Sequence, residues 1–179
     1  MSYPIRSLRS EGVYHVMNMA AAGQPMFQRD AHRRTFLHLL AKSVHRHDIE
    51  VHAYCLMGTH FHLLLRTLKP NLDAGIRYAT SQYVRYYNAD VGRNGPLFRS
   101  RYKSVDVLSD EQFVWTSRYI HRNPVDLGVQ DLAKYPWSSM SSYISGRFDG
   151  ITTIDFTLEL AGGRERYASL VNESAVLRR

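Results

Sequence analysis

Two histidines, His60 and His62, begin an apolar run of Phe and Leu residues that ends at Leu65. The Gly58-Thr59 pair before this run, followed by Phe and Leu, predicts a buried strand. Because strand side chains alternate between two faces, both imidazoles project from one face, about 7 Å apart along the strand. Two such imidazoles can bind one metal ion, since histidine is the commonest metal ligand. Taken alone, the pair fits better with polar residues on a half-exposed sheet or with hydrogen-bonded core histidines.

A second pair, Tyr119 and Asn123, stands four residues apart in a predicted helix, so the two side chains share a face. A tyrosine can act as a nucleophile that forms a covalent intermediate. Its phenol has a pKa of about 10, so it needs assistance, which a metal that polarises a phosphate oxygen can give. Asn123 can complete the coordination that the two histidines begin. The alternative is that Tyr119 is a core aromatic beside Trp115.

The densest basic stretch lies between these pairs, and Phe98 and Tyr102 are interleaved with its charges. Its four basic residues are Arg93, Arg99, Arg101 and Lys103. One interpretation is an edge that binds phosphates and stacks bases. The other is a solvated connection whose aromatic residues anchor it to the core. Tyrosine and phenylalanine serve both purposes, so the sequence leaves the two interpretations open.

The chain has 179 residues, a formal net charge of +7 and a pI of about 9.7. The length predicts one domain with a small extension, and the charge favours an anionic partner such as nucleic acid. The single cysteine, Cys55, lies in an apolar run, which predicts a core residue and a reducing, cytoplasmic location. No apolar run approaches the ~20 residues that a membrane span requires.

Apolar periodicity and punctuation residues predict strands and helices in the order β-α-β-β-α-β, with a further helix. The expected strands are 13–18, 50–57, 60–67 and 104–108, and the expected helices are 30–47, 72–92 and 109–123. This order predicts an α+β fold with a ferredoxin-like split β-α-β sheet and helices packed on one face. The last helix should begin at the capping box 109–112 and end before Pro124. The histidines of the first helix are assigned to solvated surface: His32, His38, His45 and His47.

Five segments in chain order resemble the HUH single-tyrosine (insertion-sequence-200-like) transposases, and within them the REP-associated tyrosine transposases. They are residues 14–16 (Tyr-His-Val), 53–64, 95–103, 119–125 and 135–139. The resemblance covers about residues 10–146, so we expect a transposase domain at 1–146 and a C-terminal extension of open role at 147–179. One departure is Gly58-Thr59, where Pro-Asn or a similar pair is usual in the family.

The resemblance implies metal-dependent cleavage and rejoining of single-stranded, hairpin-forming DNA through a 5′-phosphotyrosine intermediate. It implies that Tyr119 is the nucleophile and that His60, His62 and Asn123 bind Mg²⁺ or Mn²⁺. The ligand types alone would also suit Zn²⁺. Arg93, Arg99, Arg101 and Lys103 are then candidate DNA contacts. Related enzymes are monomers or homodimers, so a monomer or a homodimer is expected here.

Two other functions fit the same residues. The first is a protein without chemistry that binds DNA or RNA hairpins on its sheet, with tyrosines and arginines as contacts. The second is a metal-dependent hydrolase that attacks through water, in which Tyr119 is structural. A covalent DNA adduct on Tyr119 distinguishes the transposase from both alternatives.

Overall fold

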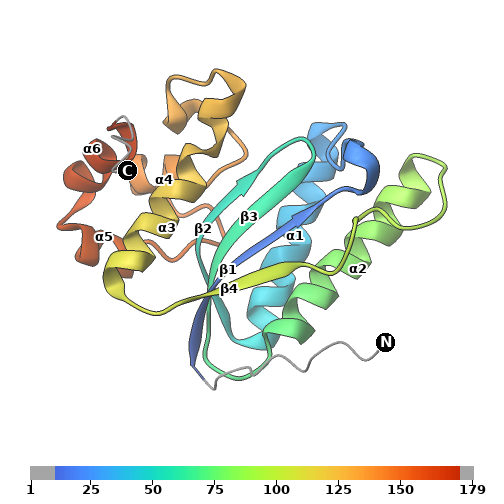
Figure 1. Ribbon diagram of the computed structural model, residues 1–179, viewed down its shortest axis with the longest axis horizontal. Helices are drawn as coiled ribbons and strands as arrows, with labels where there is room; N and C mark the ends of the chain where they lie inside the picture. Colours follow the sequence, from blue (N-terminus) through green and yellow to red (C-terminus); the bar gives the residue numbers. More distant parts are fainter. Residues whose placement is uncertain (1–10, 174–179) are drawn as a thin grey trace.

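The computed structural model describes residues 11–173, which form one four-stranded sheet with helices on both of its faces (Figure 1). The strands are β1 (Gly12–Met19), β2 (Ile49–Leu56), β3 (His60–Thr67) and β4 (Lys103–Val107). The helices are α1 (Asp30–His47), α2 (Leu72–Asp90), α3 (Asp110–Arg122), α4 (Met140–Ser145), α5 (Asp155–Ala161) and α6 (Arg164–Asn172). Short 3-10 turns are η1 (Ala21–Gly23), η2 (Asn123–Leu127) and η3 (Leu132–Lys134).

The sheet order is β2-β3-β1-β4, and each neighbouring pair is antiparallel. This order and the alternation of strands and helices confirm the predicted α+β, ferredoxin-like fold. Strand β3 has the predicted limits, whereas β1, β2 and β4 differ from the prediction by one residue at each end. Such differences are expected, because the end of a strand is defined by backbone pairing with the neighbouring strand, which the type of the terminal residue does not predict.

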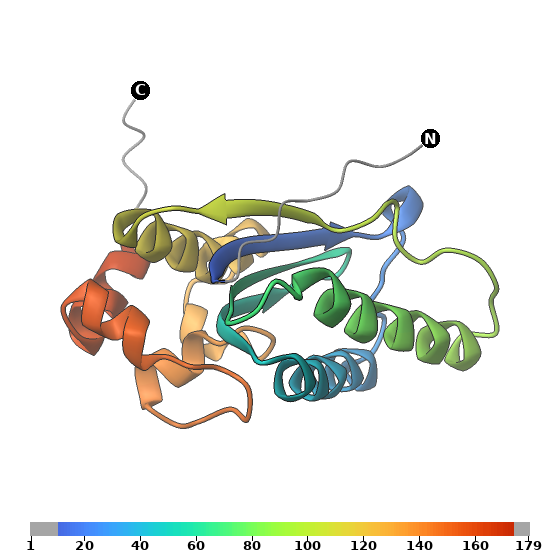
Figure 2. The ribbon, with the colours of Figure 1, turned by 90° about the horizontal axis from the view of Figure 1, so that it is seen from below.

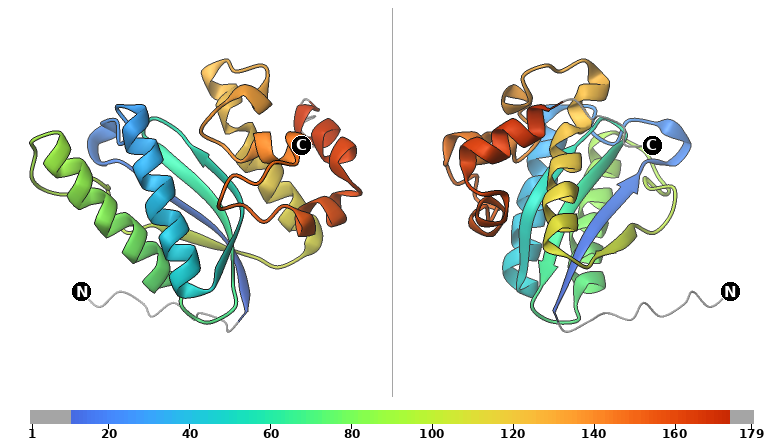
Figure 3. Two further views of the ribbon diagram at one scale, coloured as in Figure 1. Left: turned by 180° about the vertical axis from the view of Figure 1, so that it is seen from behind. Right: turned by 60° about the vertical axis from the view of Figure 1, so that its left-hand side comes forward.

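Helices α1 and α2 lie side by side on one face of the sheet (Figures 2 and 3). Their side chains Phe36 and Tyr83 pack with Val16 and Leu63 of the central strands in the main core. The expectation that helices pack on one face holds for these two helices only.

Helix α3 covers the opposite face (Figure 1). Its side chains Phe113 and Ile120 form a second core with Ala53, Cys55 and Leu64 of the sheet. The physical reason is that β2 and β3 are almost entirely buried, so both faces of the sheet are apolar. An apolar sheet face must be covered by another layer. The predicted role of Cys55 as a core residue is confirmed, since its exposure is 0%.

The outer edge of β2 is covered by two segments of the C-terminal part of the chain. The backbone of Trp137 accepts a hydrogen bond from Leu56 N, and the hydroxyl of Tyr135 donates to Leu56 O. Further along the edge, Thr153 N donates to Val51 O over 2.8 Å. An uncovered edge strand invites pairing with other chains, so these segments protect β2.

A third core lies on the outer side of α3, between α4 and α6. Its buried members come from both sides of residue 146: Leu132, Met140, Tyr143, Tyr167 and Val171. The described part of the expected extension, residues 147–173, therefore packs into the same body as the segment before it.

A buried polar network joins α6 to α3 next to this core. The hydroxyl of Tyr167 lies 2.7 Å from Nδ1 of His121 and 2.5 Å from Oγ of Ser117. Nε2 of His121 lies 2.7 Å from Oγ of Ser139. Burial lowers the pKa of His121 to about 3, so the ring is neutral at pH 7 and takes one donor and one acceptor role.

The surface assignment of His32 is wrong. Its ring is fully buried, with Nε2 2.7 Å from the Asp90 carboxylate and Nδ1 accepting from Gln28 N. Burial lowers the pKa of His32, so the ring is neutral and donates through Nε2–H to Asp90. His38 and His45 are exposed as predicted, and His47 is half-buried. His32 is buried because it lies one turn before Phe36 on the same face of α1, where the end of α2 packs on its ring through Tyr87 and Asp90.

Candidate active site

The paired histidines project from the same face of β3, as predicted, and this face is the one that α3 covers. The ring centroids of His60 and His62 lie 5.2 Å apart with the rings perpendicular. His62 is buried at 7% exposure, and His60 is half-buried. Burial lowers the pKa of His62 to about 3, with His15 and His60 adding to the effect. Burial also lowers the pKa of His60. Both rings are therefore neutral at pH 7, which is the form that binds metal.

Both histidines use Nδ1 for contacts within the protein. Nδ1 of His62 lies 3.0 Å from Nε2 of His15 on β1, and Nδ1 of His60 lies 3.2 Å from Oγ1 of Thr59. The nitrogen left for a ligand is Nε2 in each ring. Thr59, at the position where the sequence departs from the family pattern, thus contacts the ring of His60.

Helix α3 brings Tyr119 to these rings. The helix begins at the predicted capping box, in which Ser109 Oγ accepts from Gln112 N and Gln112 Oε1 accepts from Leu108 N. The ring centroid of Tyr119 lies 5.6 Å from that of His62 and 5.7 Å from that of His15, edge to face in both pairs. Tyr119 is 53% exposed, which argues against the core-aromatic alternative. Among residues 11–173, no side chain or backbone group hydrogen bonds its hydroxyl.

Asn123 follows the last residue of α3 and is buried at 8% exposure. Its amide nitrogen donates to the carbonyls of Tyr119 and Ile120, over 3.0 and 3.3 Å. These bonds leave the amide oxygen as the acceptor. Burial lowers the pKa of His60, and Asn123 opposes that effect, which is consistent with an amide that lies near this ring. The fold therefore brings together all four residues predicted for the site.

His15 is the residue of this cluster that sequence reasoning did not assign. It lies in β1, on the strand face shared with Met17, and its ring stacks on that of His62 with centroids 5.2 Å apart. Two signals were present in the sequence. One is the Tyr14-His15-Val16 segment, and the other is the alternation in β1 that places His15 on one face. Neither signal says which strand lies beside β1.

A pocket of about 520 Å³ opens beside the histidines, and its rim is basic. The strand register explains the charge, because Met17 on β1 pairs with His62 on one side and with Lys103 on the other. Arg99 and Arg101 also line the pocket. Three of the four predicted DNA contacts are thus next to the histidines.

The fourth predicted contact, Arg93, lies elsewhere. Its guanidinium donates to Gln24 Oε1 over 2.7 Å and to Pro96 O over 3.0 Å, and it does not line the pocket. Arg101 differs from Arg99 and Lys103 in a further way, because it forms a 2.8 Å ion pair with Asp73. The same carboxylate pairs with Arg77 at 2.7 Å.

The aromatic residues of the basic stretch anchor it to the core. Tyr102 is buried at 6% exposure and its hydroxyl lies 3.3 Å from Asp73, while Phe98 packs on Phe61. Arg99, Arg101 and Lys103 are exposed. The anchoring interpretation therefore applies to the aromatic residues, and the side chains of Arg99 and Lys103 are exposed at the rim of the pocket.

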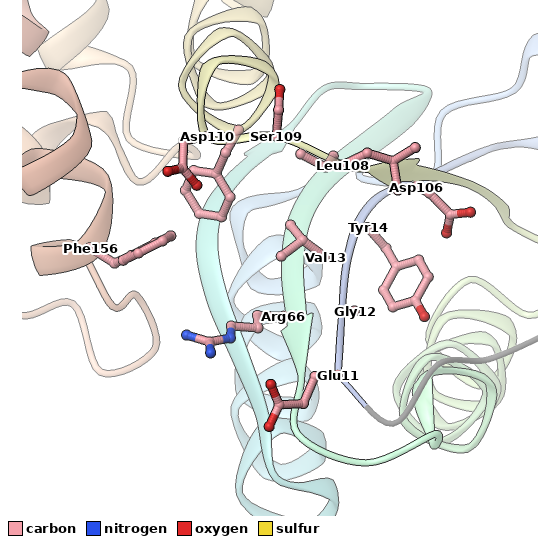
Figure 4. A pocket seen from close by; sticks show the side chains of 12 residues that line it. Glu11, Gly12, Val13, Tyr14, Arg66, Asp106, Leu108, Ser109, Asp110 and Phe156 are labelled. Carbon is pink, nitrogen blue, oxygen red and sulfur yellow. The ribbon is translucent and has the colours of Figure 1, made fainter.

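A second cavity, of about 340 Å³, lies at the other end of the sheet (Figure 4). Its walls carry the carboxylates of Glu11, Asp106 and Asp110 and the guanidinium of Arg66. Three acidic groups against one basic group repel phosphate, so this cavity does not suit a nucleic acid backbone.

The donor set beside Tyr119 fits a divalent metal ion. It offers two neutral imidazole nitrogens, each ring held through its other nitrogen, and one amide oxygen. Within the described residues there is no group of three or more His, Cys, Asp and Glu side chains arranged to hold a metal ion, so the amide is needed for a third protein ligand. Two nitrogens and one oxygen suit a borderline ion such as Mn²⁺.

Comparison with known proteins places the chain among the transposases. The family described as "Transposase IS200 like" matches residues 9–123. The chain belongs to this IS200-like transposase family, and the resemblance seen in the sequence is confirmed.

A solved structure of a REP-associated tyrosine transposase bound to a REP hairpin has the same fold. It aligns with a TM-score of 0.68 at 16% identity, over 87% of this chain and 93% of that chain. A putative transposase from Deinococcus radiodurans R1 aligns with a TM-score of 0.44 at 16% identity, over 68% and 97% of the two chains. No curated protein matches the sequence. Over residues 11–173, none of the helices is both long and apolar enough to cross a membrane.

Proposed function

We propose that this transposase cleaves and rejoins single-stranded, hairpin-forming DNA, with Tyr119 as the nucleophile. The observation that carries the proposal is the packing of the Tyr119 ring against His62, at 5.6 Å between centroids, beside a basic pocket. An exposed tyrosine, two neutral imidazoles and an amide oxygen on one surface suit phosphoryl transfer to a phenol.

In the proposed reaction, the hydroxyl oxygen of Tyr119 forms a bond to phosphorus and loses its proton to solvent. The bond from phosphorus to the 3′ oxygen breaks, and that oxygen takes up a proton to become a free 3′-hydroxyl. The product is a 5′-phosphotyrosine link. Attack by a 3′-hydroxyl reverses these changes and releases Tyr119, so the number of phosphodiester bonds is conserved.

His60, His62 and Asn123 would hold Mg²⁺ or Mn²⁺, which when bound polarises the scissile phosphate. The chain's own contribution is positioning. His62 and His60 present Nε2, and the Asn123 amide is fixed by two helix carbonyls. Arg99 and Lys103 would bind the DNA backbone at the pocket rim, with a smaller contribution from Arg101. For Arg93, which lies away from the pocket, DNA contact stays a prediction.

We further propose that, within the expected extension 147–179 of the transposase domain 1–146, the described residues 147–173 hold α3 in place. The buried contacts of Tyr167 with His121 and Ser117 support this role. The oligomeric state stays a prediction, a monomer or a homodimer.

The test uses labelled single-stranded hairpin DNA with Mn²⁺, analysed on a denaturing gel. We expect a covalent protein–DNA adduct with the wild type and none with Tyr119→Phe, while DNA binding by the variant is unchanged. Tyr86→Phe, which changes a partly buried tyrosine on α2, serves as the matched control and should keep the adduct. Cleavage that survives Tyr119→Phe would favour a hydrolase, and binding without metal or adduct in the wild type would favour a hairpin-binding protein.

A further inference from the structure

We propose that His15 is a positioning residue, which orients His62 and fixes its tautomer so that Nε2 faces the metal. This inference rests on the proposed function, because it concerns how one of the proposed ligands is held. His15 touches neither the expected DNA strand nor the ion in this scheme and acts through His62.

The strand register places the two rings together. His15 on β1 pairs with Leu64 of β3, and its neighbour Met17 pairs with His62, so His15 and His62 are diagonal neighbours on one face. Diagonal side chains in an antiparallel pair lie within reach of long or aromatic residues. Here Nε2 of His15 lies 3.0 Å from Nδ1 of His62, and the rings are stacked at 30°.

A hydrogen bond between two neutral imidazoles needs one donor and one acceptor. When Nδ1–H of His62 donates to His15, Nε2 of His62 carries the free lone pair. The opposite arrangement protonates Nε2 of His62 and prevents it from binding a metal. Metal-binding histidines usually donate their other ring N–H to a fixed partner, and that partner sets the tautomer.

His60 has an equivalent arrangement with a different partner. Its Nδ1 lies 3.2 Å from Oγ1 of Thr59, a hydroxyl that can accept a hydrogen bond. The two histidines of the site are therefore held in the same way, each through Nδ1. His15 also contacts the nucleophile, since its ring centroid is 5.7 Å from that of Tyr119. One side chain on β1 thus fixes a proposed ligand and packs against the proposed nucleophile.

The first measurement is Mn²⁺ binding to the full protein by titration calorimetry. His15→Phe keeps a ring against Tyr119 but removes the acceptor, and we expect its Mn²⁺ affinity to fall by about 10–100-fold. His15→Gln places an amide oxygen near the position of Nε2 and should retain most of the affinity. Unfolding curves identify any variant that fails to fold. Equal affinity in wild type and His15→Phe overturns the proposal.

The second measurement needs neither metal nor DNA. Ring-nitrogen NMR of the metal-free protein reports which nitrogen of each histidine carries the proton. We expect His62 protonated on Nδ1 in wild type and His15→Gln, and shifted towards the Nε2–H form in His15→Phe. An unchanged His62 tautomer in His15→Phe contradicts the proposal. Mg²⁺ is then added to the wild type as a separate step, and a change at Nε2 of His15 in place of His62 would make His15 itself a ligand and overturn the proposal.

These results separate the inference from the proposed function. If the wild type binds no divalent metal but the His62 tautomer depends on His15, the proposed function fails and the positioning contact stands. If the wild type binds metal and forms the adduct while His15→Phe matches it in both measurements, the inference fails alone.

Discussion

The ring of Tyr119 packs edge-on against the ring of His62, with 5.6 Å between their centroids. The two residues belong to α3 and β3, and α3 reaches β3 because its apolar side chains Phe113 and Ile120 cover the second face of the sheet. Core packing therefore positions the proposed nucleophile, and a change that weakens the packing of α3 should also displace Tyr119.

We expect Asn123 to set the strength and selectivity of metal binding. Asn123→Leu removes the amide oxygen of a proposed ligand. It should weaken Mn²⁺ binding at least as much as the loss of an outer-shell partner, which costs about 10–100-fold in affinity. Asn123→Asp supplies a charged oxygen, which hard cations prefer, and should strengthen Mg²⁺ and Mn²⁺ binding. Titration calorimetry measures both effects.

Asn88→Leu is the matched control for Asn123→Leu. Asn88 also donates from its amide to a backbone carbonyl, that of Gly95, over 2.9 Å. Asn88→Leu removes one hydrogen bond and should lower the free energy of unfolding by about 1 kcal/mol, whereas Asn123→Leu removes two and should lower it by about 2 kcal/mol. Only the change at Asn123 should alter metal affinity, and equal metal binding by all of these proteins would remove Asn123 from the site.

The basic residues of the pocket should differ in their contribution to DNA binding. Each phosphate contact on a single strand contributes about −0.7 to the slope of log affinity against log salt concentration. Arg99→Ala and Lys103→Ala should each reduce the slope by about this amount. Arg101→Ala should reduce it less, because Asp73 already compensates that charge. Fluorescence anisotropy over a salt series measures these slopes.

Asp73→Asn gives the opposite test of the same charges. It releases Arg101 and Arg77 from their shared carboxylate, so affinity for single-stranded DNA should rise and the salt slope should become steeper. Glu111→Gln, on the exposed first turn of α3, changes the net charge equally and serves as control. A similar gain in both variants would mean that only net charge matters.

The contact between α6 and α3 should stabilise the site. Tyr167→Phe removes the hydroxyl that bonds both His121 and Ser117, and leaves buried polar groups without a partner. We expect a loss of about 1–3 kcal/mol in the free energy of unfolding, measured with urea. Tyr86→Phe, on α2, should cost much less. A loss no larger than that of the control would show that the network does not hold α3.

The thiol of Cys55 should report whether α3 stays on the sheet. Burial raises the pKa of Cys55 from 9.0 to about 12, so the folded protein at pH 8 contains about 1000-fold less thiolate than a free cysteine. Alkylation by iodoacetamide should be slow when the protein is folded, fast in denaturant, and faster as pH rises. Mass spectrometry follows the reaction, and Tyr167→Phe should accelerate it. Rapid alkylation of the folded wild type would contradict the packing of α3.

Local patterns predicted much of the fold. Alternation placed His60 and His62 on one face of β3, and the capping box at Ser109 marked the start of α3. The burial of His32 was missed although His32 lies one turn before Phe36 on the buried face of α1, because histidine was assigned to the surface by its polarity. Its hydrogen-bond partner Asp90 comes from α2, and the local pattern of α1 does not identify that partner. The periodicity of α3 also did not predict that α3 covers the face opposite to α1 and α2, because an apolar stripe can pack on either face of a sheet.

The sequence by itself determined the types, spacing and local geometry of the site residues, because strand alternation and the helical turn act over a few residues. Tertiary structure decided which of these pieces meet. The sheet order places His15 beside His62, and the strand register places Lys103 beside the pocket. Tyr119 lies beside the histidines because α3 packs on the apolar second face of the sheet. The ion pair between Arg101 and Asp73 likewise depends on the tertiary structure, because the two residues come from different segments. These contacts join segments that are far apart in the sequence. The apolar pattern of a segment predicts that the segment is buried, but it does not identify the segment that packs against it.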